Sequence, residues 1–439
     1  MKKSVIALIL LAVLVIIVSP GIIGKLAEDS VNENLNWAAE ESGELIVTSD
    51  GFDRGWFSSE GQHRVEIGDG SIRAAMSSAD DSMAESEIPV LLINTHIDHG
   101  LIPLSSMSRA EGSLSPGLGS AISTLAIEMS DGESIDLPGT IYSDLSLGGD
   151  LNSRYVLDAG SYTADDGEVT WQPGAIRVAA SAKTGDIDFE GAVGAMTFAN
   201  DLDVVSIDSL TIVGSQVNTP YGFRVGDLDL DMGTMTINNN GMAAGGIQGI
   251  SVKGSSSVDD GLVMAAMRIE MSGQTVPGFG DISVIADMDF DNVDAVALGA
   301  VSRRLDDLSG SQDPTIIMMT AEEELKDLVA AGINIGVDQL DVALPMGTVT
   351  SRMSFELPKT DRTTFAWTSL LLDLVGEVYI SVPEELVQLA TSMDPQAGAL
   401  IGMGYLKKDG NVYILDAQMK KGLLTVNGAP IPIPMGAFQ

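Results

Sequence analysis

The stretch Val225-Gly226-Asp227-Leu228-Asp229-Leu230-Asp231-Met232 alternates acidic and apolar residues. Successive side chains of a β strand point to opposite faces, so the pattern predicts a strand with its aspartates in water and its leucines on an apolar side. The aspartates superficially resemble a calcium loop, but such loops need a curled backbone, a following glycine and a distal glutamate. The alternation therefore favours a solvated strand face over a metal site.

Similar short alternating segments surround this stretch from about residue 120 to 290, separated by glycine, aspartate and asparagine. Turn signals that recur every ~8–15 residues favour an antiparallel meander over alternating β and α units. Because the polar residues fall on one face and the apolar residues on the other, we expect a sheet with one wet and one apolar side.

Helical spacing appears in the last third of the chain, at Val293 to Leu308, Ala321 to Ala331 and Pro383 to Leu389. For the second helix, Thr320 and Glu323 predict a capping box and Gly332 predicts the end. Pro383 is expected in the first turn of the third helix. The predicted fold class is a β-rich α+β protein: a large antiparallel meandering sheet with a few helices in the C-terminal third, preceded by one N-terminal transmembrane helix.

The N-terminus has Lys2 and Lys3 before an uncharged stretch at residues 4–23, which reaches the ~20 residues needed to cross a bilayer. A cleaved signal peptide is the alternative, but no A-x-A-like site follows the apolar run. The two lysines are expected to stay cytoplasmic and the remainder to be exported. We predict an anchor at 1–24, a helical stalk at 25–43, an antiparallel β-rich region at 44–290 and an α+β region at 291–439, continuous with the sheet.

The composition is strongly acidic, with 62 acidic against 23 basic residues and a formal net charge of −39. Such a chain repels phosphate backbones, so we expect no nucleic acid as a partner. The acids are dispersed, which favours a solvated acidic surface over binding of divalent cations or a basic partner. Cysteine is absent, which excludes thiol catalysis, disulfides and thiolate metal sites.

Few residues are candidates for chemistry, and we predict no cofactor and no catalytic residues. His96, Asp98 and His99 are weak candidates for a metal site, because imidazole and carboxylate bind Zn²⁺ and alternate strand positions share a face. A third and a fourth ligand are not visible, so polar residues at a strand end are the simpler reading. Ser58 or Ser59 with His63 could be a nucleophile and base, but no G-x-S-x-G elbow accompanies them.

Two segments resemble the bacterial YdgA-like family. The first, Phe52 to Ser59 (FDRGWFSS), resembles its (aromatic)-x-R-G-(apolar)-F-S-S signature, and the end, GYLKKDGNVY from Gly404 followed by GLLTVNGAP from Gly422, is similar to its C-terminal pattern. The turn Asp98-His99-Gly100 resembles its D-H-G-P motif, although Leu101-Ile102 precedes Pro103 here. The motif residues are Arg54, Gly55, Trp56, Phe57, Ser58, His99, Gly100, Tyr405, Asp409, Gly410, Asn427 and Gly428.

The resemblance implies an inner-membrane-anchored envelope protein with a domain of unknown function, and it implies no mechanism. We interpret the first motif structurally: Gly55 relieves crowding at a bend, Trp56 and Phe57 anchor the first strand, and Arg54 pairs with an acid.

We therefore expect a single-pass protein of the bacterial inner membrane with its N-terminus in the cytoplasm and its body in the periplasm. The first hypothesis is a non-enzymatic scaffold, protein-interaction or lipid-handling protein. Its expected partners are the membrane, through residues 4–23, and a second copy, another envelope protein or a lipid. The alternative is an envelope hydrolase or metal-dependent enzyme that uses His96, Asp98 and His99.

Overall fold

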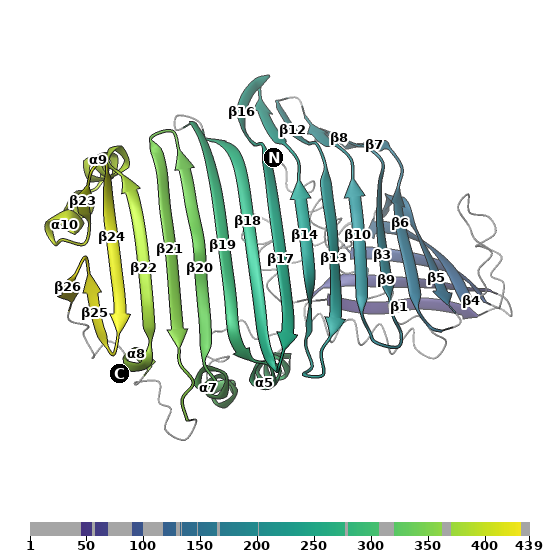
Figure 1. The fold of residues 1–439 in the computed structure, drawn as a ribbon. Helices are drawn as coiled ribbons and strands as arrows, with labels where there is room; N and C mark the ends of the chain where they lie inside the picture. The colour runs from purple at the N-terminus through teal and green to yellow at the C-terminus, as the bar shows by residue number, and fades with distance from the viewer. Residues whose placement is uncertain are drawn as a thin grey trace. The chain divides into compact units, whose positions relative to one another are not determined.

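The computed structural model describes most of the chain after residue 44: 45–54, 58–68, 90–99, 117–128, 132, 134–146, 148–164, 167–200, 202–276, 280–306, 320–361 and 370–431. Within these ranges the chain is mainly antiparallel β strand, and its helices lie in the last third of the sequence (Figure 1). The predicted large antiparallel sheet with few helices is thus confirmed.

The predicted anchor and stalk, residues 1–43, lie outside the described residues. Within the described ranges, no helix combines the length and the apolar character that a membrane crossing requires. The predicted transmembrane helix therefore stays a prediction.

The chain divides into two compact units. The first comprises residues 1–203, 209–218 and 305–317, and the second comprises residues 204–208, 219–304 and 318–439. The division falls within the predicted region 44–290. The strand Gly280–Asp294 pairs with the strand Ile333–Leu344, so the antiparallel pairing continues into the predicted C-terminal region.

The first unit is a ladder of antiparallel strands, each paired with the next one named. The order is β1 (Leu45–Arg54), β2 (Ser58–Ile67), β3 (Val90–His99), β4 (Gly117–Glu128), β5 (Ser134–Ser146), β6 (Leu151–Leu157), β9 (Gly174–Ala180), β10 (Ile187–Val193) and β13 (Leu210–Asn218). Three further strands, β7 (Gly160–Ala164), β8 (Gly167–Trp171) and β11 (Met196–Ala199), pair in that order.

One face of the first unit is well buried: Leu125 and Ile127 of β4 are only 2% and 1% exposed. The same face buries hydroxyl groups, which satisfy one another across neighbouring strands, as for Thr95 and Ser123 at 2.8 Å. A buried hydroxyl without a partner would cost stability, so such pairs make polar residues tolerable in this core.

A bulge in β5 shapes the centre of this unit. The register between β4 and β5 shifts between Leu137 and Thr140, where Gly139 adopts a φ of +108°. The phenol of Tyr155 donates a 2.5 Å hydrogen bond to the carbonyl of Pro138. A proline lacks the N–H that a regular ladder would use, which explains why it is accommodated at a bulge.

The second unit is another antiparallel ladder, again given in pairing order. Its strands are β14 (Arg224–Met232), β17 (Gly249–Asp259), β18 (Leu262–Val276), β19 (Gly280–Asp294), β20 (Ile333–Leu344), β21 (Gly347–Leu357), β22 (Val375–Pro383), β24 (Val412–Lys420), β25 (Leu423–Val426) and β26 (Ala429–Ile431). β23 (Lys407–Asp409) also pairs with β24, while β12 (Asp203–Ile207), β15 (Met235–Asn239) and β16 (Met242–Ile247) pair in series, and β16 reaches β18.

The helices of the second unit are α5 (Ala295–Asp306), α7 (Glu322–Ala330), α8 (Leu370–Asp373), α9 (Glu384–Met393) and α10 (Pro395–Gly402). α5 begins directly after β19, where the Asp294 carboxylate accepts a 2.9 Å hydrogen bond from the Ala297 N–H. This side-chain cap satisfies a backbone donor that the helix itself leaves open.

Two details of the predicted helix ends are wrong. The N-cap of α7 is Ala321 and carries no side-chain cap, while Glu323 forms an ion pair with Lys326 at 3.1 Å, so there is no capping box with Thr320. Pro383 is the last residue of β22 and the N-cap of α9, one position before the first turn. The predicted helix end at Gly332 is confirmed, because Gly332 has a φ of +95° and its N–H donates to the carbonyl of Val329.

Candidate functional site

The predicted strand at Val225 to Met232 is confirmed as part of β14, and its register shows what each face meets. Asp229 lies opposite Lys253 of β17, and the two form a 2.8 Å ion pair. The hydrogen bond between them lowers the pKa of Asp229 and raises the pKa of Lys253. The central aspartate of the alternation is therefore paired with a cation from the next strand, whereas Asp227 and Asp231 lie opposite serines.

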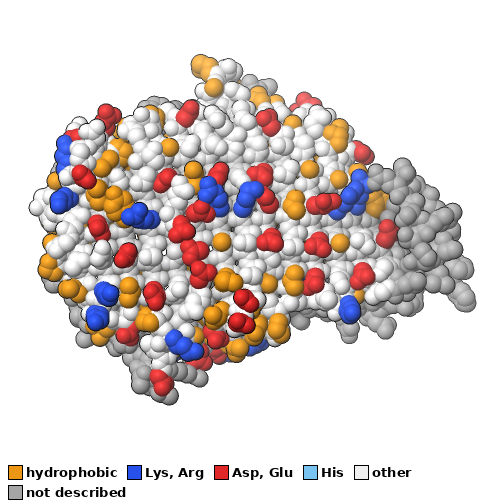
Figure 2. Space-filling view, in the orientation of Figure 1, with side chains coloured by type: hydrophobic (Ala, Val, Ile, Leu, Met, Phe, Trp, Pro, Cys, Tyr) orange, Lys and Arg blue, Asp and Glu red, His pale blue; other side chains and the backbone are white. Residues whose placement is uncertain are grey.

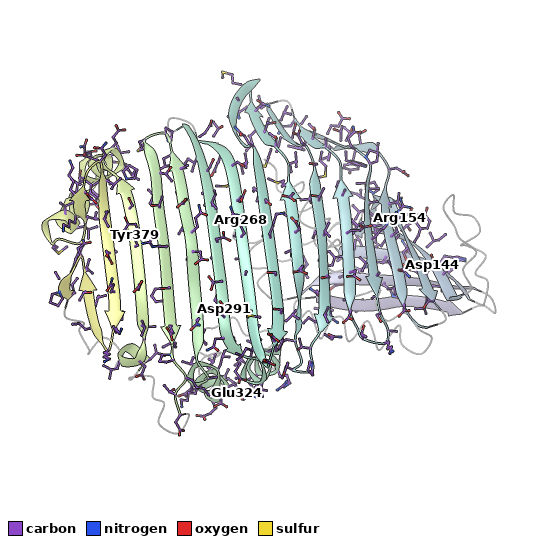
Figure 3. All side chains as sticks on the ribbon, viewed as in Figure 1. Asp144, Arg154, Arg268, Asp291, Glu324 and Tyr379 are labelled. Carbon is purple, nitrogen blue, oxygen red and sulfur yellow. The ribbon has the colours of Figure 1, made fainter. Side chains whose placement is uncertain are left out.

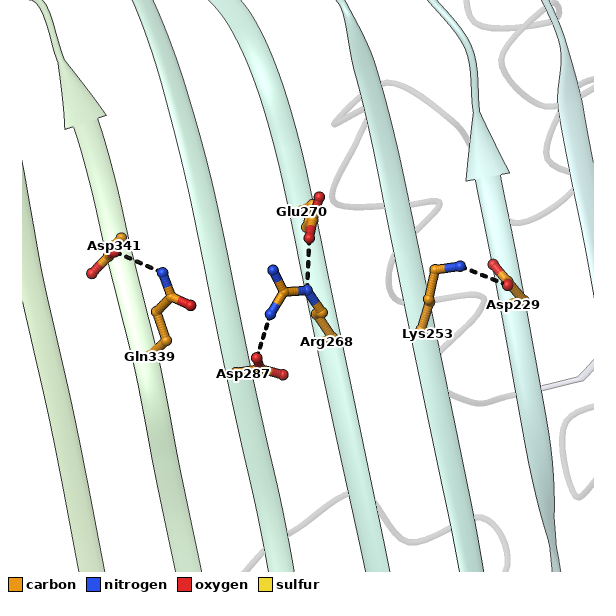
Figure 4. A network of polar contacts seen from close by, with 7 residues as sticks. All are labelled: Asp229, Lys253, Arg268, Glu270, Asp287, Gln339 and Asp341. Atoms are coloured by element: carbon orange, nitrogen blue, oxygen red, sulfur yellow. Dashed lines mark hydrogen bonds and ion pairs between the residues drawn. The ribbon is translucent and has the colours of Figure 1, made fainter.

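Arg268 of β18 forms the centre of the same face. It lies opposite both Lys253 and Asp287, and its guanidinium contacts Glu270 at 2.6 Å and also Asp287 (Figure 4). These two carboxylates raise the pKa of Arg268 further. One arginine thus neutralises acids from two adjacent strands, and the ladder holds it between them.

Figure 2 shows this charged face, with acidic side chains over many strands and fewer basic ones among them. Arg268 and Tyr379, labelled in Figure 3, both belong to it, and the Tyr379 ring lies 4.6 Å beneath the guanidinium of Arg352. Ion pairs this exposed add little stability each. Their main effect is to make this side of the unit a polar, hydrated surface.

The opposite side of the second unit is apolar, because the register places the alternate residues of successive strands there. We call this surface the apolar face. Its members include Leu228, Leu230, Met232, Ile250, Val252, Met267, Ile269, Met271, Val284, Met288, Phe290, Ile335, Val337, Leu340, Val342, Val349, Met353, Phe355, Val378, Ile380, Leu415 and Met419.

The apolar face is more exposed than the core of the first unit. Met267 is 38% and Phe290 44% exposed, whereas Ile127 in the first unit is 1% exposed. Six of the named members are methionines, whose flexible and polarisable side chains adapt to irregular apolar partners. The exposed members of the apolar face are Leu228, Met267, Phe290 and Ile335, at 36–44% exposure, whereas Met419 is 8% exposed. A partly exposed apolar surface of this kind is a candidate binding surface.

The histidine candidates, His96 and His99, lie on β3. His96 pairs in register with Glu60 of β2, and their side chains approach to 3.6 Å. The side chains of Asp98 and His99 lie outside the described residues, as does Gly100. Within the described part of the chain, no three histidine, cysteine or acidic side chains are grouped to hold a metal ion. The metal site stays an untested prediction.

His63 cannot complete such a site from its position. It pairs with Ile93, three residues from the pair of Glu60 and His96, so it lies on the opposite face of the sheet and is buried. The side chains of Ser58 and Ser59 lie outside the described residues. The hypothesis of a nucleophile and base formed by Ser58 or Ser59 with His63 therefore stays untested.

The first family motif lies at a β hairpin. β1 and β2 pair from Leu45 with Ile67 to Arg54 with Ser59, on either side of residues 55–57. Gly55, Trp56 and Phe57, and the side chains of Arg54 and Ser58, lie outside the described residues. The predicted roles of these residues therefore stay predictions.

The C-terminal motif is assembled around Asn427. Its side-chain amide donates to the carbonyls of Gly404, Tyr405 and Ile414 at 3.0, 3.1 and 3.4 Å. Its side-chain oxygen accepts a 3.1 Å hydrogen bond from the backbone N–H of Asp416. One side chain thus joins the loop after α10 to β24 and to the turn before β26.

The backbone explains why this position and its neighbours have these residues. Asn427 and Gly428 have φ values of +50° and +79°, and Gly410 in the predicted turn after Asp409 has +60°. Asparagine and glycine adopt this left-handed conformation at the least cost. The turn at Asp409 and Gly410 is confirmed by the antiparallel pair of β23 and β24. The partners of Asn427 were not evident from the sequence, since they lie 11 to 23 residues away.

Comparison with known proteins gives a family and one relative. A family model described as "Bacterial protein of unknown function (DUF945)" matches residues 1–434. Protein YdgA of Escherichia coli (strain K12) is 27% identical over 250 residues, which are 52% of this chain and 46% of that protein. The match thus spans about half the length of the relative. No solved structure is significantly similar to the chain.

Proposed function

The chain belongs to the DUF945 family of bacterial proteins of unknown function. From its own structure we propose that it is an inner-membrane-anchored envelope protein that binds the acyl chain of a lipid on the apolar face. In this proposal, residues 4–23 form the anchor, the body lies in the periplasm, and the protein is not an enzyme.

The observation that carries the proposal is the contrast between the two sides of the second unit. One side holds Asp229, Lys253 and Arg268 in ion pairs, and the other presents Met267 and Phe290 at 38% and 44% exposure. Apolar surface exposed to water is unfavourable by about 25 cal/mol for each Å², so an apolar ligand gains binding energy when it covers this face. An acyl chain fits the chemistry, because the face offers contacts without a charged partner.

Methionine supports a lipid over a rigid partner. Met232, Met267, Met271, Met288 and Met353 lie on four adjacent or nearby strands of this face. Their flexible and polarisable side chains can follow an acyl chain in many conformations.

The test compares two variants of one strand. Met267 is on the apolar face, and Met264 of the same strand is on the charged face at a similar exposure of 40%. The full chain and its Met267→Asp and Met264→Asp variants are purified identically, and bound lipids are counted by native mass spectrometry. Lipid around the anchor is common to all three proteins.

We expect the wild-type chain and the Met264→Asp variant to retain additional lipid and the Met267→Asp variant to lose it, because a carboxylate on the apolar face would be desolvated by the acyl chain. Equal lipid content in the two variants, or no lipid beyond that of the anchor, would refute lipid binding on the apolar face.

A further inference from the structure

A second exposed apolar surface lies on the helical hairpin of α9 and α10, beside the ends of β22 and β23 (Figure 1). Met393 at the end of α9 is 74% exposed, Leu400 of α10 is 41% exposed, and Met403 directly after α10 is 59% exposed. We call these three residues, with Ala399, the helical tip. Large apolar side chains at such exposure do not contribute to a core.

The charge pattern around the helical tip differs from that of the chain as a whole. Residues 395–406 contain no charged residue, and Lys407 and Lys408 follow directly. The chain contains 62 acidic residues, yet the nearest ones in the sequence flank this run at Asp394 and Asp409. Lys408 forms an ion pair with Glu384, and Lys407 is exposed. The tip thus combines an apolar end with an adjacent cationic group.

The helical tip is fixed to the sheet. The carbonyl of Leu400 accepts hydrogen bonds from the N–H groups of Tyr405 and Leu406 at 2.9 and 3.3 Å. The Asn427 amide donates to the carbonyls of Gly404 and Tyr405, which anchors the same loop to β24. Because these bonds hold the loop, the apolar residues are presented in one arrangement, which lowers the entropy lost on binding.

We propose that the helical tip docks on the surface of a phospholipid bilayer, with Leu400, Met403 and Met393 at the acyl boundary and Lys407 at the lipid phosphates. A short helix with an apolar end and an adjacent lysine matches the interfacial mode, in which apolar side chains enter about 5–10 Å into the headgroup boundary. The lysine stem can lie along the apolar layer while its ammonium remains among the phosphates.

Charge favours a bilayer over a second copy of the chain as the occupant. Two tips that met face to face would bring their lysines together, whereas lipid phosphates complement the lysines. The acidic body is repelled by anionic lipids, but screening over about 8 Å at physiological ionic strength confines this repulsion to surfaces near the membrane. The contact is independent of acyl-chain binding on the apolar face, so either proposal can fail alone.

The experiment uses the absence of cysteine in the chain to label single sites. Met403→Cys and Met393→Cys report on the tip, and Met242→Cys, at the β15–β16 turn with 71% exposure, is the matched control. Each full-length variant is labelled with an environment-sensitive fluorophore and reconstituted in phosphatidylcholine–phosphatidylglycerol vesicles. Vesicles with brominated acyl chains, which quench nearby fluorophores, are compared with vesicles without bromine.

We expect bromine to quench the labels at residues 403 and 393 about twofold or more, as insertion at the headgroup boundary implies, and to leave the label at 242 unchanged. Leu400→Asp is expected to abolish quenching at 393 without affecting the far-ultraviolet circular dichroism. The absence of quenching at both tip sites, or equal quenching at residue 242, would overturn the proposal. A change in fluorescence that depends on protein density and not on bromine would also overturn it, because it would indicate contact between copies of the chain.

Discussion

Asn427→Ala provides the sharpest test of how the C-terminal motif works. The substitution removes the hydrogen bonds to Gly404, Tyr405 and Asp416 and the longer one to Ile414. At about 1 kcal/mol for each bond, and less where water can replace the partner, this loss amounts to roughly 2–3 kcal/mol. Alanine at a φ of +50° adds roughly 1 kcal/mol of backbone strain.

A second asparagine separates these two contributions. Asn240 has nearly the same φ, +52°, in the turn between β15 and β16, but its amide donates to the exposed side chain of Asn239. Asn240→Ala therefore carries the backbone strain without the loss of a network. We expect it to cost about 2 kcal/mol less than Asn427→Ala.

Hydrogen–deuterium exchange of the full chain measures the local effect. In Asn427→Ala, amides of residues 400–406 and 412–428 are expected to exchange about 30-fold faster or more, since 1.4 kcal/mol corresponds to a factor of ten. In Asn240→Ala these segments should exchange at the wild-type rate. Wild-type exchange in Asn427→Ala would show that the side-chain bonds do not hold the loop.

Three further predictions concern the two ladders. Lys253→Met is expected to lower the urea midpoint at neutral pH but not in acid below the lowered pKa of Asp229, because the stability that this ion pair gives is lost as the pH falls through that pKa. An equal effect in acid would contradict this. Burial raises the pKa of Tyr155 to about 12, so the folded state keeps this phenol protonated at a pH where the unfolded chain releases its proton. Wild-type stability is therefore expected to fall by up to about 2–3 kcal/mol as the pH rises from 10.0. The stability of Tyr155→Phe is expected to depend less on pH in this range. Gly139→Ala is expected to cost about 3 kcal/mol or more of stability, because its Cβ would lie 2.7 Å from the Tyr155 ring. Gly132→Ala has open space around its Cβ, so it would add only backbone strain. Similar urea midpoints of the two variants would refute the steric argument.

Local alternation and turn residues were sufficient to predict much of the second ladder. The strand at Val225 to Met232 and the turn at Asp409 and Gly410 follow from patterns a few residues long. The helix end at Gly332 was also predictable, because a left-handed residue commonly ends a helix. The capping box at Thr320 was wrong, since the sequence did not show that the helix begins one residue later than predicted, with Ala321 as its N-cap.

The rest of the fold could not be predicted, because it depends on pairing between residues that lie far apart in the sequence. Arg268 meets Asp287 only because of the register between β18 and β19, and the sequence does not specify that register. The partners of Asn427 likewise come from two separate segments, the loop after α10 and β24. For the candidate site, alternation predicted that an apolar side exists, but its exposure depends on what covers it, which no local pattern encodes.

Site-resolved crosslinking tests most directly whether an acyl chain occupies the apolar face. A phospholipid with a photoactivatable group in its acyl chain is incubated with the full-length protein, irradiated, and the adducts are mapped by peptide mass spectrometry. Adducts are predicted at Met267 and Phe290 on the apolar face and not at Met264 on the charged face of the same strand. Equal labelling of Met264 and Met267, or labelling confined to residues 4–23, would contradict the account.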